Sequence, residues 1–391
     1  MRKFIVVLVA CVWVYCGSPA HAQEPLLVPG AASPVRVGSG SGRVLLADIN
    51  RDGHLDLITQ HILTSNIALL SGDGKGHYSP FDGTPMRLGY QPGAIAIGDV
   101  NNDGILDLGV TSRDDRSEYV HVLVGNGNGS FMPVAGSPLT VSASAKSYKP
   151  SLQFVDVNED KNLDVVAANG RRNTIEILFG DGRGRFSRGS IVNLEPGFNN
   201  YSFALGDVDG DGRLDLVAAC SDTGVEPGRM AIMHGDGKGE FKDDHGSRFA
   251  VPSGFRVGTL ADMNGDRHLD IVAYYETELS VLLNQGSGKF TPDVGSTWRL
   301  GMRAFAVVVA DINRDKIPDL VAATVGHTAP YKSRVEILLG DGRGFASAPG
   351  SPFPVGPGAY NVAVGDVDED GKLDIAASSF EGDGVTILLG R

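Results

Sequence analysis

The sequence predicts an all-β protein, and three observations support this prediction. A nine-residue acidic loop recurs seven times, with its first aspartates 49 to 57 residues apart. Short apolar runs rich in β-branched residues flank every loop, and no long amphipathic helical pattern occurs. Gly accounts for 53 of the 391 residues, which supplies many tight turns. Internal repeats of this period are typical of solenoids, propellers and arrays.

The first 22 residues have the pattern of a secretion signal. Two basic residues precede the apolar run Phe4–Tyr15, and Ala20–Ala22 forms a small-x-small cleavage site. The apolar run is shorter than the ~20 residues that a membrane-spanning helix requires. We therefore expect a signal peptide over 1–22, a mature single domain over 23–391, and secretion to the periplasm or the cell exterior.

The charge of the chain excludes a nucleic-acid binder that works by electrostatics. The formal net charge is −13, and it becomes −15 once Arg2 and Lys3 leave with the signal. Seven divalent ions in the acidic loops would bring this charge to about −1. The mature chain keeps only Cys220, so we expect no intrachain disulfide and a Cys220 buried in a strand.

Every repeat has the same order of elements. The fourth repeat shows it: a strand over 202–206, the acidic loop 207–215, a second strand that starts near 214, and a third strand over 230–233. The Gly-rich turn 235–241 then leads into an outer strand. Asp-Gly pairs favour tight hairpins, and neither a following Lys-Ser/Thr nor a helix pattern supports a phosphate-binding loop. Four antiparallel strands repeated seven times predict a seven-bladed β-propeller.

The two chain ends distinguish a closed ring from an open solenoid. The last repeat stops at Arg391, directly after its third strand, and therefore lacks a fourth. Residues 26–38 resemble the outer-strand regions of other repeats, such as 131–138 and 345–352. We expect the N-terminal strand to complete the last blade, because closure removes the exposed sheet edges.

The acidic loops place oxygen-bearing side chains at relative positions 1, 3, 5 and 9. Side chains two residues apart in a tight turn direct their oxygens toward one centre, which suits calcium with its six to eight oxygen ligands. A metal-free Asp-rich turn is the alternative for any single loop, but seven copies with the same spacing favour a metal. The side-chain candidates are Asp48, Asn50, Asp52, Asp56, Asp99, Asn101, Asp103, Asp107, Asp156, Asn158, Asp160, Asp164, Asp207, Asp209, Asp211, Asp215, Asp262, Asn264, Asp266, Asp270, Asp311, Asn313, Asp315, Asp319, Asp366, Asp368, Asp370 and Asp374.

Together, the loops and the Gly-rich turns resemble the FG-GAP/VCBS repeat family of integrin α-subunit propellers and many secreted bacterial proteins. The resemblance covers the mature chain and implies calcium between the first and second strands of each blade. It also implies a carbonyl ligand at position 7. The residues at that position are His54, Ile105, Asn162, Arg213, His268, Ile317 and Lys372.

Three loops depart from the pattern at position 6, where Gly supports the sharp turn. They carry Lys161, Arg267 and Lys316. A non-Gly residue with positive φ costs about 1 kcal/mol, so we expect weaker calcium binding there. The tightest sites are expected in the four-aspartate loops 207–215 and 366–374.

For function, we predict a binding module for an extracellular protein or polysaccharide, monomeric and without a membrane span. Its ligand would contact the face opposite the calcium loops. The variable loops on that face are rich in aromatic and charged residues, and they comprise 112–119, 196–201, 274–275 and 326–332, with Trp298 and Arg299 nearby.

The alternative is a calcium-dependent enzyme similar to a polysaccharide lyase. The histidines are scattered, and no Ser-His-Asp or paired-carboxylate pattern is visible outside the acidic loops. We therefore expect no catalytic residues and no enzyme activity.

Overall fold

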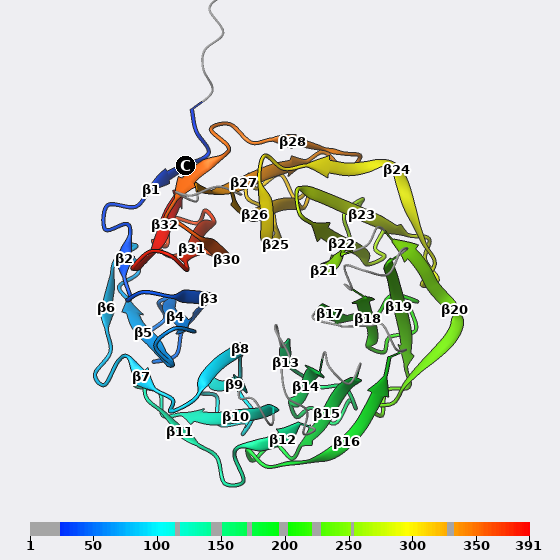
Figure 1. The fold of residues 1–391 in the computed structure, drawn as a ribbon, viewed down its shortest axis with the longest axis horizontal. Helices are drawn as coiled ribbons and strands as arrows, with labels where there is room; N and C mark the ends of the chain where they lie inside the picture. The colour runs from blue at the N-terminus through cyan, green and yellow to red at the C-terminus, as the bar shows by residue number, and fades with distance from the viewer. Residues whose placement is uncertain are drawn as a thin grey trace, which may run out of the picture.

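Seven antiparallel sheets stand around a central axis and form a closed ring (Figure 1). The structure, a computed structural model, describes residues 24–113, 118–141, 151–169, 174–194, 202–220, 228–251, 254–326 and 332–391. The secondary structure within these ranges consists of 32 strands and no helix. The predicted all-β, seven-bladed β-propeller is confirmed. The expected signal peptide over 1–22 lies outside the described residues.

Each blade runs from an inner strand at the channel to an outer strand at the rim. The first three blades contain β3 (Ser41–Ala47), β4 (Asp56–His61), β5 (Asn66–Gly72), β6 (Tyr78–Pro80) and β7 (Met86–Arg87); β8 (Gln91–Gly98), β9 (Asp107–Arg113), β10 (Glu118–Gly125), β11 (Phe131–Pro133) and β12 (Leu139–Val141); and β13 (Leu152–Val155), β14 (Asp164–Asn169), β15 (Thr174–Gly180) and β16 (Phe186–Asn193). The next two contain β17 (Ser202–Gly206), β18 (Asp215–Cys220), β19 (Gly228–Gly235) and β20 (Phe241–Val251); and β21 (Arg256–Ala261), β22 (Asp270–Tyr275), β23 (Glu278–Asn284) and β24 (Phe290–Arg299). The last two contain β25 (Arg303–Ala310), β26 (Asp319–Val325), β27 (Ser333–Gly340), β28 (Phe345–Ser347) and β29 (Phe353–Val355); and β30 (Ala359–Gly365), β31 (Asp374–Ser379), β32 (Gly384–Gly390), β1 (Leu27–Pro29) and β2 (Val35–Arg36).

The N-terminal strand closes the ring, as the chain ends indicated. In β1, Leu27 pairs with Gly390 and Val28 pairs with Leu389 of β32, so the first and last strands share one sheet (Figure 1). Further along, β2 pairs with the other half of β32. The open-solenoid alternative is therefore wrong for this chain.

The outer position of four blades is divided between two short strands. In the second blade, for example, β11 and β12 both pair with β10 and are separated by the stretch that contains Pro138. Proline has no N–H to donate to a strand ladder, which explains the interruption. The same Ser/Thr-Pro pair stands at the breaks near Pro34, Pro85 and Pro352.

The core consists of the interfaces between blades. In the middle strands both faces are covered by neighbouring blades, so β31 is buried along its whole length. Between the sixth and seventh blades, Val321 and Ile337 belong to one apolar cluster with Ile375 and Leu388. This packing explains why the sequence shows continuous apolar runs instead of strict alternation.

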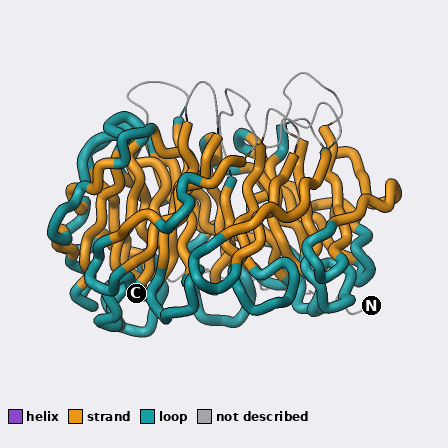
Figure 2. Tube along the Cα trace, turned by 90° about the horizontal axis from the view of Figure 1, so that it is seen from below, coloured by secondary structure: helices purple, strands orange, loops and turns teal. Residues whose placement is uncertain are grey.

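The ring has two different ends. The acidic loops join first to second strands and the Gly-rich turns join third to fourth strands, so both lie at one end of the barrel-shaped ring. The links between second and third strands and the links to the next blade lie at the other end. Figure 2 shows the strands from the side, spanning between these two layers. No helix in the described ranges is both long and apolar enough to cross a bilayer.

Candidate functional site

All seven acidic loops share a backbone shape with two positive φ angles. Position 6 is one of them, as expected, with φ of 71° at Lys161, 72° at Arg267 and 70° at Lys316. The second lies at position 4, which the sequence argument did not identify. Five loops place a residue other than Gly there, namely Arg51, Asn102, Glu159, Arg314 and Glu369.

The last aspartate of each loop is fully buried and joins the loop to the third strand. Asp56 shows the pattern: its Oδ2 accepts the Ile49 N–H at 2.9 Å, and its Oδ1 accepts the Gly72 N–H at 3.0 Å. The equivalent pair of bonds is present in every blade. Position 9 is therefore a structural link as well as a candidate metal ligand.

Burial makes these position-9 carboxylates costly to ionise. It raises the pKa of Asp56 to about 6, against the lowering effect of the two backbone N–H donors. Burial has the same effect, to about 6, on the pKa of Asp107, Asp164, Asp270 and Asp374. A cation beside such a carboxylate would offset this cost.

Hydrogen bonds fold each loop around its first aspartate. The first aspartate accepts the N–H groups of positions 5 and 6 in every loop, as Asp48 does from Asp52 and Gly53. In the fourth loop, oxygens of Asp207, Asp209 and Asp211 lie within 4.8 Å of one another. In the seventh, Asp366, Asp368 and Asp374 do the same. This donor set consists of hard oxygen atoms, and it fits a calcium ion.

Basic side chains near the two four-aspartate loops were missed by the sequence argument. The Nδ1 atom of His234 lies 3.1 Å from Asp209 Oδ2 and 3.4 Å from Asp215 Oδ1. Arg213 Nη1 contacts Asp211 Oδ2 at 3.1 Å, and Lys372 Nζ contacts Asp370 Oδ2 at 2.6 Å. The expectation of tightest binding counted only acids, whereas the Arg213 and Lys372 cations contact carboxylate oxygens of the same loops.

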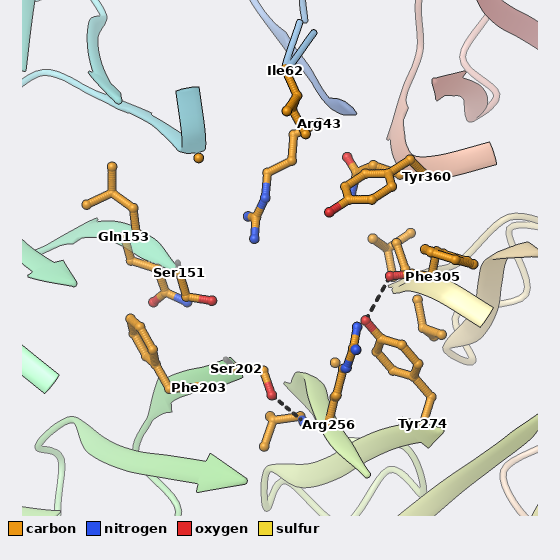
Figure 3. Close-up of a pocket in the computed structure, with 18 residues that line it drawn as sticks. Arg43, Ile62, Ser151, Gln153, Ser202, Phe203, Arg256, Tyr274, Phe305 and Tyr360 are labelled. Atoms are coloured by element: carbon orange, nitrogen blue, oxygen red, sulfur yellow. Dashed lines mark hydrogen bonds between the residues drawn. The ribbon is translucent and has the colours of Figure 1, made fainter. Parts of the chain in front are cut away.

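A second candidate site lies at the end of the central channel opposite the acidic loops. A cavity of about 260 Å³ opens there and is lined by residues from all seven blades. They come mostly from the first residues of the inner strands, such as Arg43 of β3, Arg256 of β21 and Tyr360 of β30 (Figure 3). We call this cavity the channel mouth.

The charge of the channel mouth is opposite to that of the whole chain. The side chains of Arg43 and Arg256 point into the opening from different blades (Figure 3). No Asp, Glu or His lines it among the residues that the structure describes. In an acidic protein, the mouth is therefore a local region of positive charge.

Hydrogen bonds between blades hold the wall of the mouth in place. Ser202 Oγ accepts the Val257 N–H at 3.0 Å, and the Tyr274 hydroxyl donates to the Phe305 carbonyl at 3.0 Å (Figure 3). On the opposite side, Asn361 Oδ1 accepts the Val44 N–H at 3.1 Å. Burial raises the pKa of Tyr274, so its hydroxyl stays protonated as a donor.

A row of aromatic rings extends from the mouth across the last two blades. Ring centroids of Phe305 and Tyr360 are 5.8 Å apart, and those of Tyr360 and Phe380 are 6.0 Å apart. Arg303 covers Phe305, with its guanidinium carbon 5.2 Å from the ring centroid. These residues line a second cavity of about 310 Å³, which shares Phe305 and Tyr360 with the mouth. We call it the aromatic groove.

Only some of the residues predicted for the ligand-binding face lie at the channel mouth. Tyr274 lines the mouth, as predicted for this face. The placement of Trp298 there was wrong, because its ring packs edge-on against Phe345 at 4.6 Å, between two blades. Residues 196–201 and parts of 112–119 and 326–332 lie outside the described residues, as does the side chain of Cys220, which ends β18.

The sequence argument missed Arg43, Arg256, Phe305 and Tyr360. These residues lie inside or beside apolar strand runs, so the sequence pattern indicated that they belong to the core. A usable signal was present, because a cation or aromatic ring recurs at the start of several inner strands, where a strand reaches the end of the channel.

The fold and its loops define the class of the protein as a seven-bladed β-propeller with acidic hairpin loops. Residues 48–110, 156–218 and 262–322 match the FG-GAP-like repeat, and each match begins at the first aspartate of an acidic loop. The chain is an FG-GAP repeat propeller. A search among curated proteins found no significant match.

Solved propellers have similar structures at low sequence identity. BBS1N, in a complex with ARL6DN, is 12% identical with a TM-score of 0.57, over 94% of this chain and 98% of that one. A lectin from Agrocybe aegerita that recognises non-reducing terminal N-acetylglucosamine is 18% identical with a TM-score of 0.53, over 89% and 93%. A protein from Lactobacillus plantarum is 13% identical with a TM-score of 0.55, over 90% and 92%. At these identities the likeness shows the fold alone.

Proposed function

We propose that this chain is a secreted binding module whose ligand, a carbohydrate or a protein, docks at the channel mouth. The observation that carries the proposal is the convergence of all seven blades on one polar cavity. Concave sites with a few convergent polar groups are the usual places for ligands. The hydrogen bonds between blades keep the wall preorganised, which lowers the entropic cost of binding.

Related folds support a role in recognition. One similar structure is a lectin and another was solved with a protein partner. Neither assigns a ligand to this chain, since fold alone does not determine function. They show that proteins of this fold take part in recognition.

The proposal includes calcium in the acidic loops. The support is the recurrence of oxygen-bearing side chains at positions 1, 3, 5 and 9, the close approach of three carboxylates in the fourth and in the seventh loop, and a buried carboxylate in every loop. When bound, the ion would neutralise the loop carboxylates and hold the first two strands of each blade together. The loops then stabilise the ring, while recognition occurs at its other end.

A glycan array combined with a depolymerisation assay tests the proposed function. The expected result is glycan binding without cleavage, and weaker binding by Tyr360→Ala, which removes a ring shared by the mouth and the groove. The matched control is Ile191→Ala, a 46% exposed residue on the rim strand β16.

Two outcomes would contradict the proposal. Release of unsaturated sugar products would identify the chain as a lyase instead of a binding module. Glycan binding that is unchanged in Tyr360→Ala would place the site away from the channel mouth.

A further inference from the structure

We propose that the channel mouth and aromatic groove bind an acidic saccharide, with the carboxylate of a uronic acid between Arg43 and Arg256. This inference rests on the proposed binding function and specifies its ligand class. The site would recognise one sugar by its charge and a neighbouring sugar by its flat apolar face.

The arginine pair provides the charge recognition. Both guanidinium groups lie at the opening, that of Arg256 beside the Tyr274 hydroxyl (Figure 3). The described lining of the mouth contains no acidic side chain, whereas Glu381 lines the aromatic groove. A guanidinium group matches a carboxylate with two parallel N–H donors, which gives both affinity and orientation. Because the walls of the mouth are protein, the field of the two cations is focused along the opening.

The charge of the rest of the chain narrows the choice of anion. The formal net charge of −13 repels long polyanions such as nucleic acids, which require an extended basic surface. A ligand with isolated carboxylates can place one at the mouth and keep its neutral parts elsewhere. A short uronic-acid oligosaccharide can do this, because each ring keeps neutral hydroxyls and an apolar face beside its single carboxylate.

Hydroxyl and amide groups around the arginines suit a sugar. Ser151, Gln153 and Asn361 line the mouth from the third and seventh blades. Such groups donate and accept hydrogen bonds, as ring hydroxyls do. The carboxylate and the hydroxyls of one sugar would therefore meet different parts of the same wall.

The aromatic groove supplies the second half of the site. Phe305, Tyr360 and Phe380 form a continuous row, and the cavity along it shares two residues with the mouth. The apolar face of a pyranose packs on such rings, because aromatic side chains offer large, rigid contact areas. The two cavities, at about 260 and 310 Å³, together reach the ~300–1,000 Å³ that small-ligand sites occupy.

Titration calorimetry with tetragalacturonate tests the inference, with a neutral galactose tetramer, tetraglutamate and sulfate as comparison ligands. We expect the acidic saccharide to bind and the neutral one to bind at least ~10-fold more weakly. Arg43→Gln and Arg256→Gln should each weaken acidic-sugar binding by ~10-fold or more, because each removes a charge-assisted pair. Arg188→Gln, on the exposed face of β16, is the matched charge control.

Phe380→Ala separates the two halves of the site. It should weaken binding of both tetramers by a similar factor, since it removes stacking and leaves the arginines in place. Unchanged melting temperatures for all variants would show that the fold is intact.

Each result supports or overturns the inference. Binding of uronate that does not change in either arginine variant would overturn it. Tetraglutamate or sulfate binding as tightly as tetragalacturonate, with the same arginine dependence, would overturn the saccharide class. If tetragalacturonate does not bind and a neutral glycan binds in a way that depends on Tyr360, the acidic ligand class is overturned. The proposed function then still stands.

Discussion

Backbone geometry at single residues determines which acidic loops are strained. Positions 4 and 6 have positive φ in all seven loops, but only the fourth loop has Gly at both, with Gly210 and Gly212. The third and sixth loops have Gly at neither position. Each non-Gly residue in this region costs about 1 kcal/mol, so the loops differ in strain even before any metal binds.

Gly212→Ala should therefore lower the free energy of unfolding by about 1 kcal/mol. An added Cβ at Gly212 meets nothing within 4 Å, so φ is the only source of the effect. Gly344→Ala is the matched control, because it also has open space and does not have positive φ. Urea denaturation in the presence of chelator measures both. Equal effects of the two substitutions would contradict the strain argument.

His121 provides a residue-scale test of pH dependence. Its ring stacks on Tyr90 with centroids 3.7 Å apart, and burial lowers its pKa from 6.5 to about 4. The folded state therefore requires the neutral ring. The stabilisation that depends on the neutral His121 ring is complete above pH 6.5. It is lost as the pH falls toward 4, because His121 takes up its proton in the unfolded chain first.

His121→Phe should remove this contribution and keep a flat ring against Tyr90. We expect the variant to gain stability relative to the parent as the pH falls from 6.5 toward 4. Comparison of the two pH profiles of unfolding free energy cancels the titration of all other groups. A constant difference between the profiles would show that His121 does not titrate in this way.

At the scale of elements, the acidic loops contact one another around the ring. At two junctions between blades, the side chain at position 4 of one loop hydrogen-bonds the residue at position 7 of the next. Asn102 Nδ2 donates to Asn162 Oδ1 at 2.8 Å, and Glu369 Oε1 lies 2.5 Å from His54 Nδ1 across the closing seam.

Closure of the ring depends on the short strands β1 and β2, which both pair with β32. Leu27 of β1 is 2% exposed and packs into the apolar cluster between the sixth and seventh blades. Leu27→Ala should lower the free energy of unfolding by about 2–5 kcal/mol, since it opens a cavity at the seam. Leu63→Ala, at a residue that is 63% exposed, should change it by less than about 0.5 kcal/mol. Urea denaturation of both variants measures the difference, and similar losses would argue against closure by β1.

At the scale of the whole molecule, negative charge is concentrated at one end of the ring. The acidic loops occupy that end, and the arginine-lined mouth lies at the other. This separation gives the molecule two faces with different roles in our proposals: one for cations that stabilise the blades, and one for an anionic ligand.

Chelator should lower the melting temperature of the whole chain, because ions that bind only the folded state stabilise it by mass action. Calcium should restore the original value, and sodium chloride at equal ionic strength should not. Differential scanning calorimetry measures the shift. An unchanged melting temperature in excess EDTA would exclude a stabilising role for calcium.

The sequence by itself determined the number of blades, the strand order, the position of every acidic loop and the strand that closes the ring. These features depend on residues close together in the chain, such as the spacing from Asp207 to Asp215, or on similarity between repeats. The tertiary structure alone decided which distant residues meet. Arg43 and Arg256 belong to separate repeats, and His234 reaches Asp209 from another strand. No local pattern records such contacts, because the channel mouth forms only when seven strand ends are brought together by closure of the ring.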